Sequence, residues 1–158
     1  MASEQVKRDV LVSIKPIYAD KIMDGAKTVE FRRRFPRNLS PGTILLIYSS
    51  SPTRAIIGCA TIQKVHQLSV EALWRRYGAA GCILRTDFFD YFDGLARGTA
   101  IVLDKVRRFR STVPAARLKS QFGLIAPQSF MYLRREHCAL LDDEPAQGPH
   151  RHQRLHRP

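Results

Sequence analysis

Short apolar segments alternate with short polar segments along the chain, and this pattern predicts short strands mixed with short helices. Val10–Ile14 is almost wholly apolar and predicts a buried first strand. Pro16 follows, and proline favours the first turn of a helix, so residues 17–23 with their apolar side chains at helical spacing predict a short helix. Gly25 ends this helix, because glycine is the usual left-handed cap.

The same criteria predict further elements along the chain. Strands are expected over residues 28–35, 43–48, 54–65 and 99–109, with a strand-like segment over 126–133. Gly58 inside a strand pattern is typical of a bulge. Helices are expected over 70–77 with Ser69 as N-cap, over 87–92 with Thr86 as a candidate cap, and over 115–119.

This order of elements predicts the fold class. Neighbouring strands joined by short links favour an antiparallel or mixed sheet, and 158 residues are the usual size of one domain. We therefore expect an α+β protein: a small, partly open, mixed or antiparallel β-barrel with short helices packed at its ends. The domain is predicted to span 10–141, with 1–9 as a flexible N-terminus and 142–158, where the apolar pattern stops, as a disordered tail.

The strand predicted over 28–35 carries a polar constellation. Segment 25–32 reads G-x-K-x-x-E-x-R. Alternation along a strand puts Glu30, Arg32 and Arg34 on one face, with Lys27 at the strand's entrance. Two interpretations stay open: a binding or reactive site on a rigid element, or an edge strand whose polar face is solvated and lightly ion-paired.

Charge narrows the choice of partner. Lys and Arg number 26 against 14 Asp and Glu, which gives a net charge of +12. The segment 142–158 holds three acids and three arginines, so the whole excess belongs to residues 1–141. A basic folded surface favours polyanions, with RNA or a nucleotide as the expected partner; the alternative is a solvated surface without a specific partner. The basic clusters are Arg32–Arg34 with Arg37, Arg75–Arg76, Lys105–Arg110 and Arg134–Arg135.

Other function classes find no support in the sequence. No apolar run approaches the length of a membrane span, and the N-terminus carries no apolar signal core, so we expect a cytoplasmic protein without membrane contact. The three cysteines are odd in number and widely spaced, which predicts neither a disulfide framework nor a zinc site. No metal and no cofactor are predicted.

In its motif and its order of elements, the chain resembles the ASCH-domain proteins, a branch of the PUA-like superfamily. The G-x-K-x-x-E-x-R signature stands here as Gly25, Lys27, Glu30 and Arg32. Flanking features agree over roughly Val10 to Leu133, namely Ser13-Ile14-Lys15-Pro16, Tyr48-Ser49-Ser50-Ser51-Pro52 and Ala126-Pro127-Gln128-Ser129-Phe130. The resemblance implies a β-barrel with a cleft beside the first helix and the motif strand, and RNA or nucleotide binding as the role.

Roles for individual residues follow from this resemblance and from side-chain chemistry. Lys15, Lys27 and Arg32 are expected to contact phosphate or an oxyanion, and Arg34 to join them. Two alternatives stay open: Lys27 as a solvent-exposed turn lysine, and Arg32 as the structural ion-pair partner of Glu30. Glu30 either orients these cations or reads a base. Tyr48 either stacks on a base, with the Ser49 hydroxyl as a donor, or is a half-buried barrel residue. Gln128 and Ser129 either read a base edge or close the barrel by hydrogen bonding to the backbone.

The alternative function is a hydrolase acting on RNA or on a modified nucleoside, with Lys27 and Glu30 as the catalytic candidates. The resemblance implies it, since some ASCH proteins cleave RNA and one branch deacetylates N4-acetylcytidine. That branch pairs the motif lysine with a threonine and with a glutamate before a later helix. This chain has Glu30 in the first place, and Ala79, Ala80 and Gly81 before the helix predicted at 87. RNA binding is therefore the leading hypothesis, and N4-acetylcytidine hydrolysis the less favoured form of the alternative.

Overall fold

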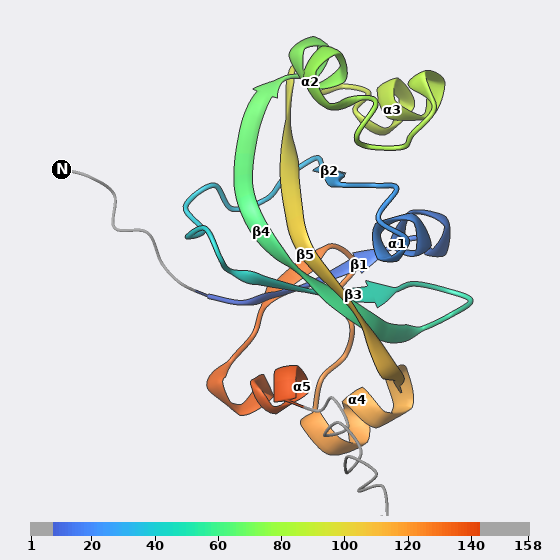
Figure 1. Ribbon diagram of the computed structural model, residues 1–158, viewed down its shortest axis with the longest axis vertical. Coiled ribbons are helices and arrows are strands. Elements are labelled where there is room, and N and C mark those ends of the chain that lie inside the picture. The colour runs from blue at the N-terminus through green and yellow to red at the C-terminus, as the bar shows by residue number, and fades with distance from the viewer. Residues whose placement is uncertain (1–7, 143–158) are drawn as a thin grey trace, which may run out of the picture.

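The computed structural model describes residues 8–142, and within them the chain forms six strands and five short α-helices (Figure 1). The strands are β1 (Val10–Ile14), β2 (Val29–Arg32), β3 (Ile44–Ser49), β4 (Ala55–Ser69), β5 (Arg97–Pro114) and β6 (Phe130–Tyr132). The helices are α1 (Pro16–Met23), α2 (Val70–Tyr77), α3 (Arg85–Tyr91), α4 (Ala115–Phe122) and α5 (Ala139–Asp142), with a 3₁₀ turn at Arg135–His137.

All six strands of the described chain belong to one mixed sheet in the order β2-β5-β4-β3-β1-β6. β1 and β3 are parallel, and the other neighbours are antiparallel. β4 and β5 are the longest strands and sweep through the molecule as a curved ribbon (Figure 1). The register of β4 shifts around Gly58, where an added Cβ would meet the Arg107 carbonyl oxygen at 2.5 Å. The bulge predicted at this glycine is therefore confirmed.

The sheet curls until its two ends approach each other, which makes a half-barrel. Arg32 on β2 donates a hydrogen bond to the backbone of Ser13 on β1, although three strands separate β2 from β1 in the sheet. The Phe35 and Phe130 rings, 5.2 Å apart, bridge the same gap. The predicted α+β fold, a partly open mixed barrel of the PUA-like kind with short helices at its ends, is confirmed.

Apolar side chains gather in three clusters within the described residues. One lies between the sheet and α1 and includes Ile14, Ile22 and Ile47. A second covers the other side of the strands with α4 and includes Leu11, Leu46 and Leu118. The third is aromatic and packs α2 and α3 onto the upper ends of β2 and β5, with Phe31, Phe88 and Phe92 as its largest side chains. The third cluster places α3 beside the motif strand.

Several element boundaries differ from the predicted ones. β2 ends at Arg32 and not at 35, because its partner β5 begins at Arg97 and the last pair is Arg32 with Thr99. β4 and β5 are longer than predicted, because the two strands pair with each other beyond their apolar stretches. Backbone hydrogen bonds hold these polar ends together, and such bonds do not require apolar side chains. α3 begins at Arg85, so Thr86 lies inside it and Leu84 is the N-cap. The last strand shrinks to β6.

Other predicted boundaries are confirmed. α2 spans the predicted residues 70–77, and the Ser69 hydroxyl caps it by accepting a hydrogen bond from the Ala72 N–H at 3.2 Å. The predicted flexible N-terminus, 1–9, and the predicted disordered tail, 142–158, lie mostly outside the described residues. At the N-terminal edge, the Asp9 carboxylate accepts a hydrogen bond from the Ile44 N–H at 2.9 Å.

Candidate functional site

A cleft of about 970 Å³ opens between the N-terminal end of α1, strand β2, helix α3 and the loop that leads into β6. Most residues selected from the sequence line it, although they come from segments far apart in the chain. These are Lys15, Lys27, Glu30, Arg32, Arg34, Gln128 and Ser129. The fold therefore brings seven of the nine candidate residues to one cavity.

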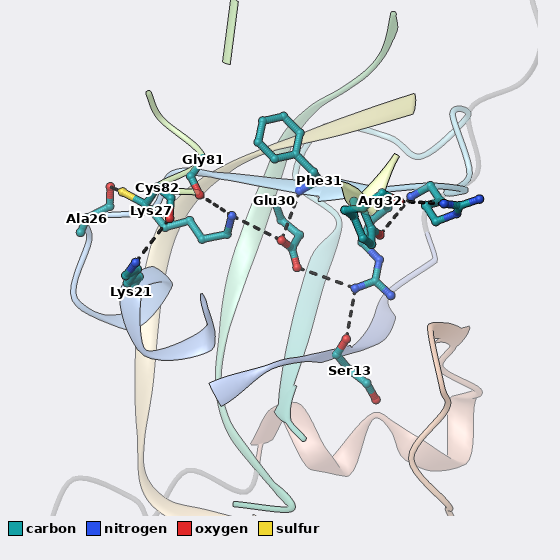
Figure 2. Close-up of polar contacts among 11 residues, drawn as sticks. Ser13, Lys21, Ala26, Lys27, Glu30, Phe31, Arg32, Gly81 and Cys82 are labelled. Carbon is teal, nitrogen blue, oxygen red and sulfur yellow. Dashed lines mark hydrogen bonds and ion pairs between the residues drawn. The ribbon is translucent and has the colours of Figure 1, made fainter. Parts of the chain in front are cut away.

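Three charged side chains form a continuous network along the floor of the cleft (Figure 2). The Lys27 Nζ lies 3.5 Å from the Glu30 Oε1, and the Arg32 Nη1 lies 3.7 Å from the Glu30 Oε2. All three are buried, with exposed fractions of 2% for Lys27, 6% for Glu30 and 9% for Arg32. β2 is an edge strand of the sheet and its charges are ion-paired, as the second interpretation of the sequence expected. That interpretation is wrong in one respect, because the polar face is buried and not solvated.

Lys27 is the most enclosed of the three charges. Its ammonium donates a hydrogen bond of 2.6 Å to the Gly81 carbonyl oxygen, which ties the motif to the segment before α3 (Figure 2). The rings of Tyr18 and Phe31 lie 5.1 and 5.5 Å from its Nζ, within cation–π range. Burial lowers the pKa of Lys27, and the attraction of Glu30 opposes that change. The result is an amine that gives up its proton more readily than a lysine in water.

Glu30 is held in place by a local contact as well as by its two cations. Its Oε1 accepts a hydrogen bond of 3.2 Å from the Phe31 N–H, directly beside it in the chain. A carboxylate held in this way presents one oxygen to Lys27 and the other to Arg32. The structure thus places the Glu30 carboxylate between the two cations, in contact with both.

Arg32 closes the barrel as well as lining the cleft. Its guanidinium donates to the Ser13 carbonyl oxygen at 3.1 Å and to the Ser129 Oγ at 2.9 Å. Ser13 in turn donates its N–H to the Ser129 carbonyl at 3.0 Å and its hydroxyl to the Pro127 carbonyl. The loop before β6 is therefore fastened to β1 and β2 by backbone and side-chain bonds together. Ser129 does close the barrel, and its hydroxyl also reaches the cleft.

Two candidate residues lie elsewhere. Tyr48 is 6% exposed, packs in the second apolar cluster and does not line the cleft. Ser49 is fully buried, and its Oγ has no hydrogen-bond partner within the described residues. Ser50, the next residue along, does line the cleft. Alternation along β3 explains the placement of Tyr48, since it shares a face with Leu46.

The sequence did not point to the side of the cleft formed by α3. Asp87, Asp90 and Tyr91 line the cavity together, at helical spacings of three and four residues. Burial raises the pKa of Tyr91, and its hydroxyl accepts a hydrogen bond from the Arg33 N–H at 3.1 Å. The spacing within α3 was a signal in the sequence, but only the third apolar cluster turns that helix toward the motif strand.

Tyr18 on α1 is a further cleft residue that the sequence did not single out. Burial raises the pKa of its hydroxyl, and the negative charges of Asp87 and Glu30 raise it further. Tyr18 therefore stays protonated through the neutral range and offers the cleft a hydrogen-bond donor. Because the carboxylates of Asp87 and Glu30 both raise the pKa of Tyr18, α1, β2 and α3 must lie close together around this part of the cleft.

Within 8–142 no three His, Cys, Asp or Glu side chains come together in a way that would hold a metal ion. None of the helices in this range is long and apolar enough to cross a bilayer.

Comparison with known proteins agrees with this geometry. A family profile described as the ASCH domain matches residues 12–124. An ASCH domain-containing ribonuclease of Zymomonas mobilis is 32% identical over 130 residues, which is 82% of this chain and 87% of that protein. The crystal structure of ASCH from Zymomonas mobilis superimposes with a TM-score of 0.81 at 31% identity, covering 89% of this chain and 98% of that one.

A more distant structure shares the fold alone. The N-terminal domain of Staphylothermus marinus McrB has a TM-score of 0.56 at 12% identity, over 92% of this chain and 99% of that one. The profile match over most of the described residues, the similar ribonuclease and the similar crystal structure agree with each other. The chain belongs to the ASCH domain family.

Proposed function

We propose that this protein binds single-stranded RNA in the cleft and cleaves it there. The observation that carries the proposal is the buried Lys27, which lines the cleft, has its Nζ 3.5 Å from the Glu30 Oε1 and has a lowered pKa. Cleavage of a phosphodiester needs a group that takes up or releases a proton at the reaction centre, and an amine with a lowered pKa suits that task. The similar protein named a ribonuclease supports the same conclusion.

Binding comes from the cations at the rim of the cleft. Lys15 and Arg34 are exposed and line the cavity, so they can reach phosphates of a bound strand. Arg33 also lines the cavity, but its Nη1 donates hydrogen bonds to the carbonyl oxygens of Tyr91 and Asp93 at 2.7 and 3.1 Å. Arg32 does not bind phosphate directly in this proposal, because its guanidinium is already bonded to Ser13 and Ser129 and paired with Glu30. It holds the floor of the cleft and adds positive potential beneath the phosphate. The net charge of +12 adds a long-range attraction to the whole chain of phosphates.

Binding without cleavage is the second candidate, and one observation favours it. Lys27, Glu30 and Arg32 satisfy one another and the backbone, an arrangement that also suits a purely structural floor. In that case the protein holds RNA and leaves it intact. The two candidates share the cleft and the rim cations and differ in whether Lys27 exchanges a proton with the RNA.

The experiment compares wild type with Lys27→Met on a fluorescent single-stranded RNA. Methionine keeps the aliphatic length and removes the amine. Lys119→Met is the matched control, because Lys119 is an exposed lysine on α4 that does not line the cleft. We expect cleavage by wild type and by the control and its loss in Lys27→Met, with circular dichroism showing that all three proteins are folded.

The same samples separate the two candidates. Intact RNA with wild-type protein, together with a measurable Kd for the same strand, would favour binding alone. Cleavage that persists in a folded Lys27→Met protein would remove Lys27 from the chemistry. Absence of both binding and cleavage at low salt would contradict the proposed function.

A further inference from the structure

The side of the cleft formed by α3 is acidic, in a protein whose overall charge is +12. Asp87 and Asp90 lie three residues apart on α3, both are exposed, and both line the cleft. Among residues 8–142, no hydrogen bond or ion pair engages either carboxylate. The positive side chains of the cleft come from other elements, with Lys15 beside α1 and Arg34 after β2. The cleft therefore has chemically different sides.

Apolar side chains gather at the same place. Within the described chain the large exposed hydrophobic residues are Ile17, Leu84, Tyr91 and Ile125. Ile17, 59% exposed, and Tyr91, 37% exposed, line the cleft, and Leu84 adjoins Ile83, which also lines it. Exposed apolar residues beside a polar cavity favour a flat ligand with apolar faces and polar edges. A nucleobase has this character, since its faces stack on apolar and aromatic side chains.

The charges decide which way a nucleotide enters. A phosphate is repelled by Asp87 and Asp90 and attracted by Lys15 and Arg34, so the backbone lies on the basic side and the base on the acidic side. A carboxylate accepts hydrogen bonds and donates none at neutral pH. It pairs well with an exocyclic amine, as carboxylates do with the cytosine N4 amine, and it repels a carbonyl oxygen. Uracil presents an oxygen at the position where cytosine presents that amine.

We propose that Asp87 and Asp90 make the cleft selective for bases with an exocyclic amine over uracil. The inference rests on the proposed function and adds the class of nucleotide that the site prefers. Ile17 and Tyr91 contact the faces of the base, and the two carboxylates accept hydrogen bonds from its amine edge. Cytosine and uracil give the cleanest comparison, because the two pyrimidines have the same size.

The test measures binding of two labelled oligonucleotides, ten cytidines or ten uridines, both 2′-O-methylated so that attack by the 2′-hydroxyl cannot shorten them. We expect wild type to bind the cytidine strand about tenfold more tightly, since one good base contact contributes a discrimination of this order. In the double variant Asp87→Asn, Asp90→Asn the ratio should fall to about twofold or less, because an asparagine amide also donates to the uracil oxygen. Both side chains are exposed, so the variant should fold.

Asp93→Asn is the matched control. Asp93 follows α3 closely and is exposed, but it does not line the cleft, so its removal changes the net charge without changing the site. The control should keep the wild-type ratio. Equal affinity of wild type for the two strands, or an unchanged ratio in the double variant, would overturn the base selectivity and leave the proposed function standing. Failure of wild type to bind either strand at 50 mM salt would overturn the proposed function and this inference with it.

Discussion

The guanidinium of Arg32 donates a 3.1 Å hydrogen bond to the backbone carbonyl of Ser13, and this bond joins the first and fifth strands of the sheet order across the open side of the half-barrel. A motif residue is therefore also a structural clasp. The same guanidinium reaches Ser129 and faces Glu30. The floor of the cleft and the closure of the barrel depend on one side chain.

Replacing Arg32 with methionine should destabilise the fold. The change leaves the buried Glu30 with one cation in place of two and removes the donors to Ser13 and Ser129, so we expect a loss of about 3 kcal/mol in the free energy of unfolding. Urea denaturation followed by fluorescence measures it. Arg34→Met is the control, because Arg34 is exposed and should change the free energy by less than ~0.5 kcal/mol. If Arg32→Met and Arg34→Met lower the free energy of unfolding by similar amounts, the hydrogen bonds from Arg32 to Ser13 and Ser129 do not stabilise the fold.

Lys27 should make stability depend on pH. Its pKa is lower in the folded protein than the ordinary 10.5, so in the window between those two values the unfolded chain binds the extra proton. Stability from this group is therefore lowest at low pH and rises as the pH approaches 10.5. The difference in unfolding free energy between wild type and Lys27→Met should shift in favour of wild type as the pH rises toward 10.5.

The upper limit of this measurement is set by Tyr18 and Tyr91. Burial raises the pKa of both above 10.0, so their contribution is present below that value and is lost as the pH rises further. Both tyrosines are retained in wild type and in Lys27→Met, but the Lys27 Nζ lies 5.1 Å from the Tyr18 ring, so their contributions cancel in the difference only while both hydroxyls stay protonated. A difference that shows no rise in favour of wild type as the pH increases would contradict the lowered pKa of Lys27.

Replacing Gly81 with alanine should displace the Phe31 side chain and so disturb the neighbouring motif residues Glu30 and Arg32. An added Cβ at this position overlaps the Phe31 ring, and the Gly81 carbonyl is the acceptor for Lys27. We expect Gly81→Ala to cost about 1–3 kcal/mol of stability, as overpacking in a core usually does. In the double variant with Phe31→Leu the smaller side chain makes room, so the total loss should be less than the sum of the single losses. Strict additivity in thermal denaturation would show that the two residues do not press on each other.

RNA affinity should fall steeply with salt if the rim cations contact phosphates. For a single strand, log K falls against log salt with a slope of about −0.7 for each phosphate neutralised. Removing one rim contact with Arg34→Ala should make this slope shallower by about 0.7. Lys119→Ala, on α4 and away from the cleft, should leave the slope unchanged. Fluorescence anisotropy between 50 and 300 mM salt is the measurement, and an equal change in both variants would place the RNA elsewhere.

Much of the fold was predictable because local signals are strong. The apolar run Val10–Ile14, the proline that opens α1 and the serine that caps α2 act within a few residues of the chain. The ends of β2, β4 and β5 were not predictable to the residue, because pairing with a distant strand sets them. The same holds for Tyr48, whose side chain faces the core because of the register of β3.

The candidate site divides in the same way. Lys27, Glu30 and Arg32 stand close together in the chain, so their alternation along a strand already predicted a shared polar face. Whether that face met water depended on α1 and α3, which cover it from positions remote in the sequence. Asp87 and Asp90 belong to the cleft only because Phe88 and Phe92 pack against Phe31 and turn α3 toward the motif.

The sequence by itself determined the order of most strands and helices, the basic charge, the ASCH signature and the short-range motif, since all of these depend on neighbouring residues or on composition. The tertiary structure alone decided that the motif charges are buried, that Arg32 clasps Ser13 and that α3 supplies an acidic side to the cleft. The physical reason is that burial and long-range contacts arise when the sheet curls and its ends meet. That step depends on the packing of the whole chain and not on any single segment.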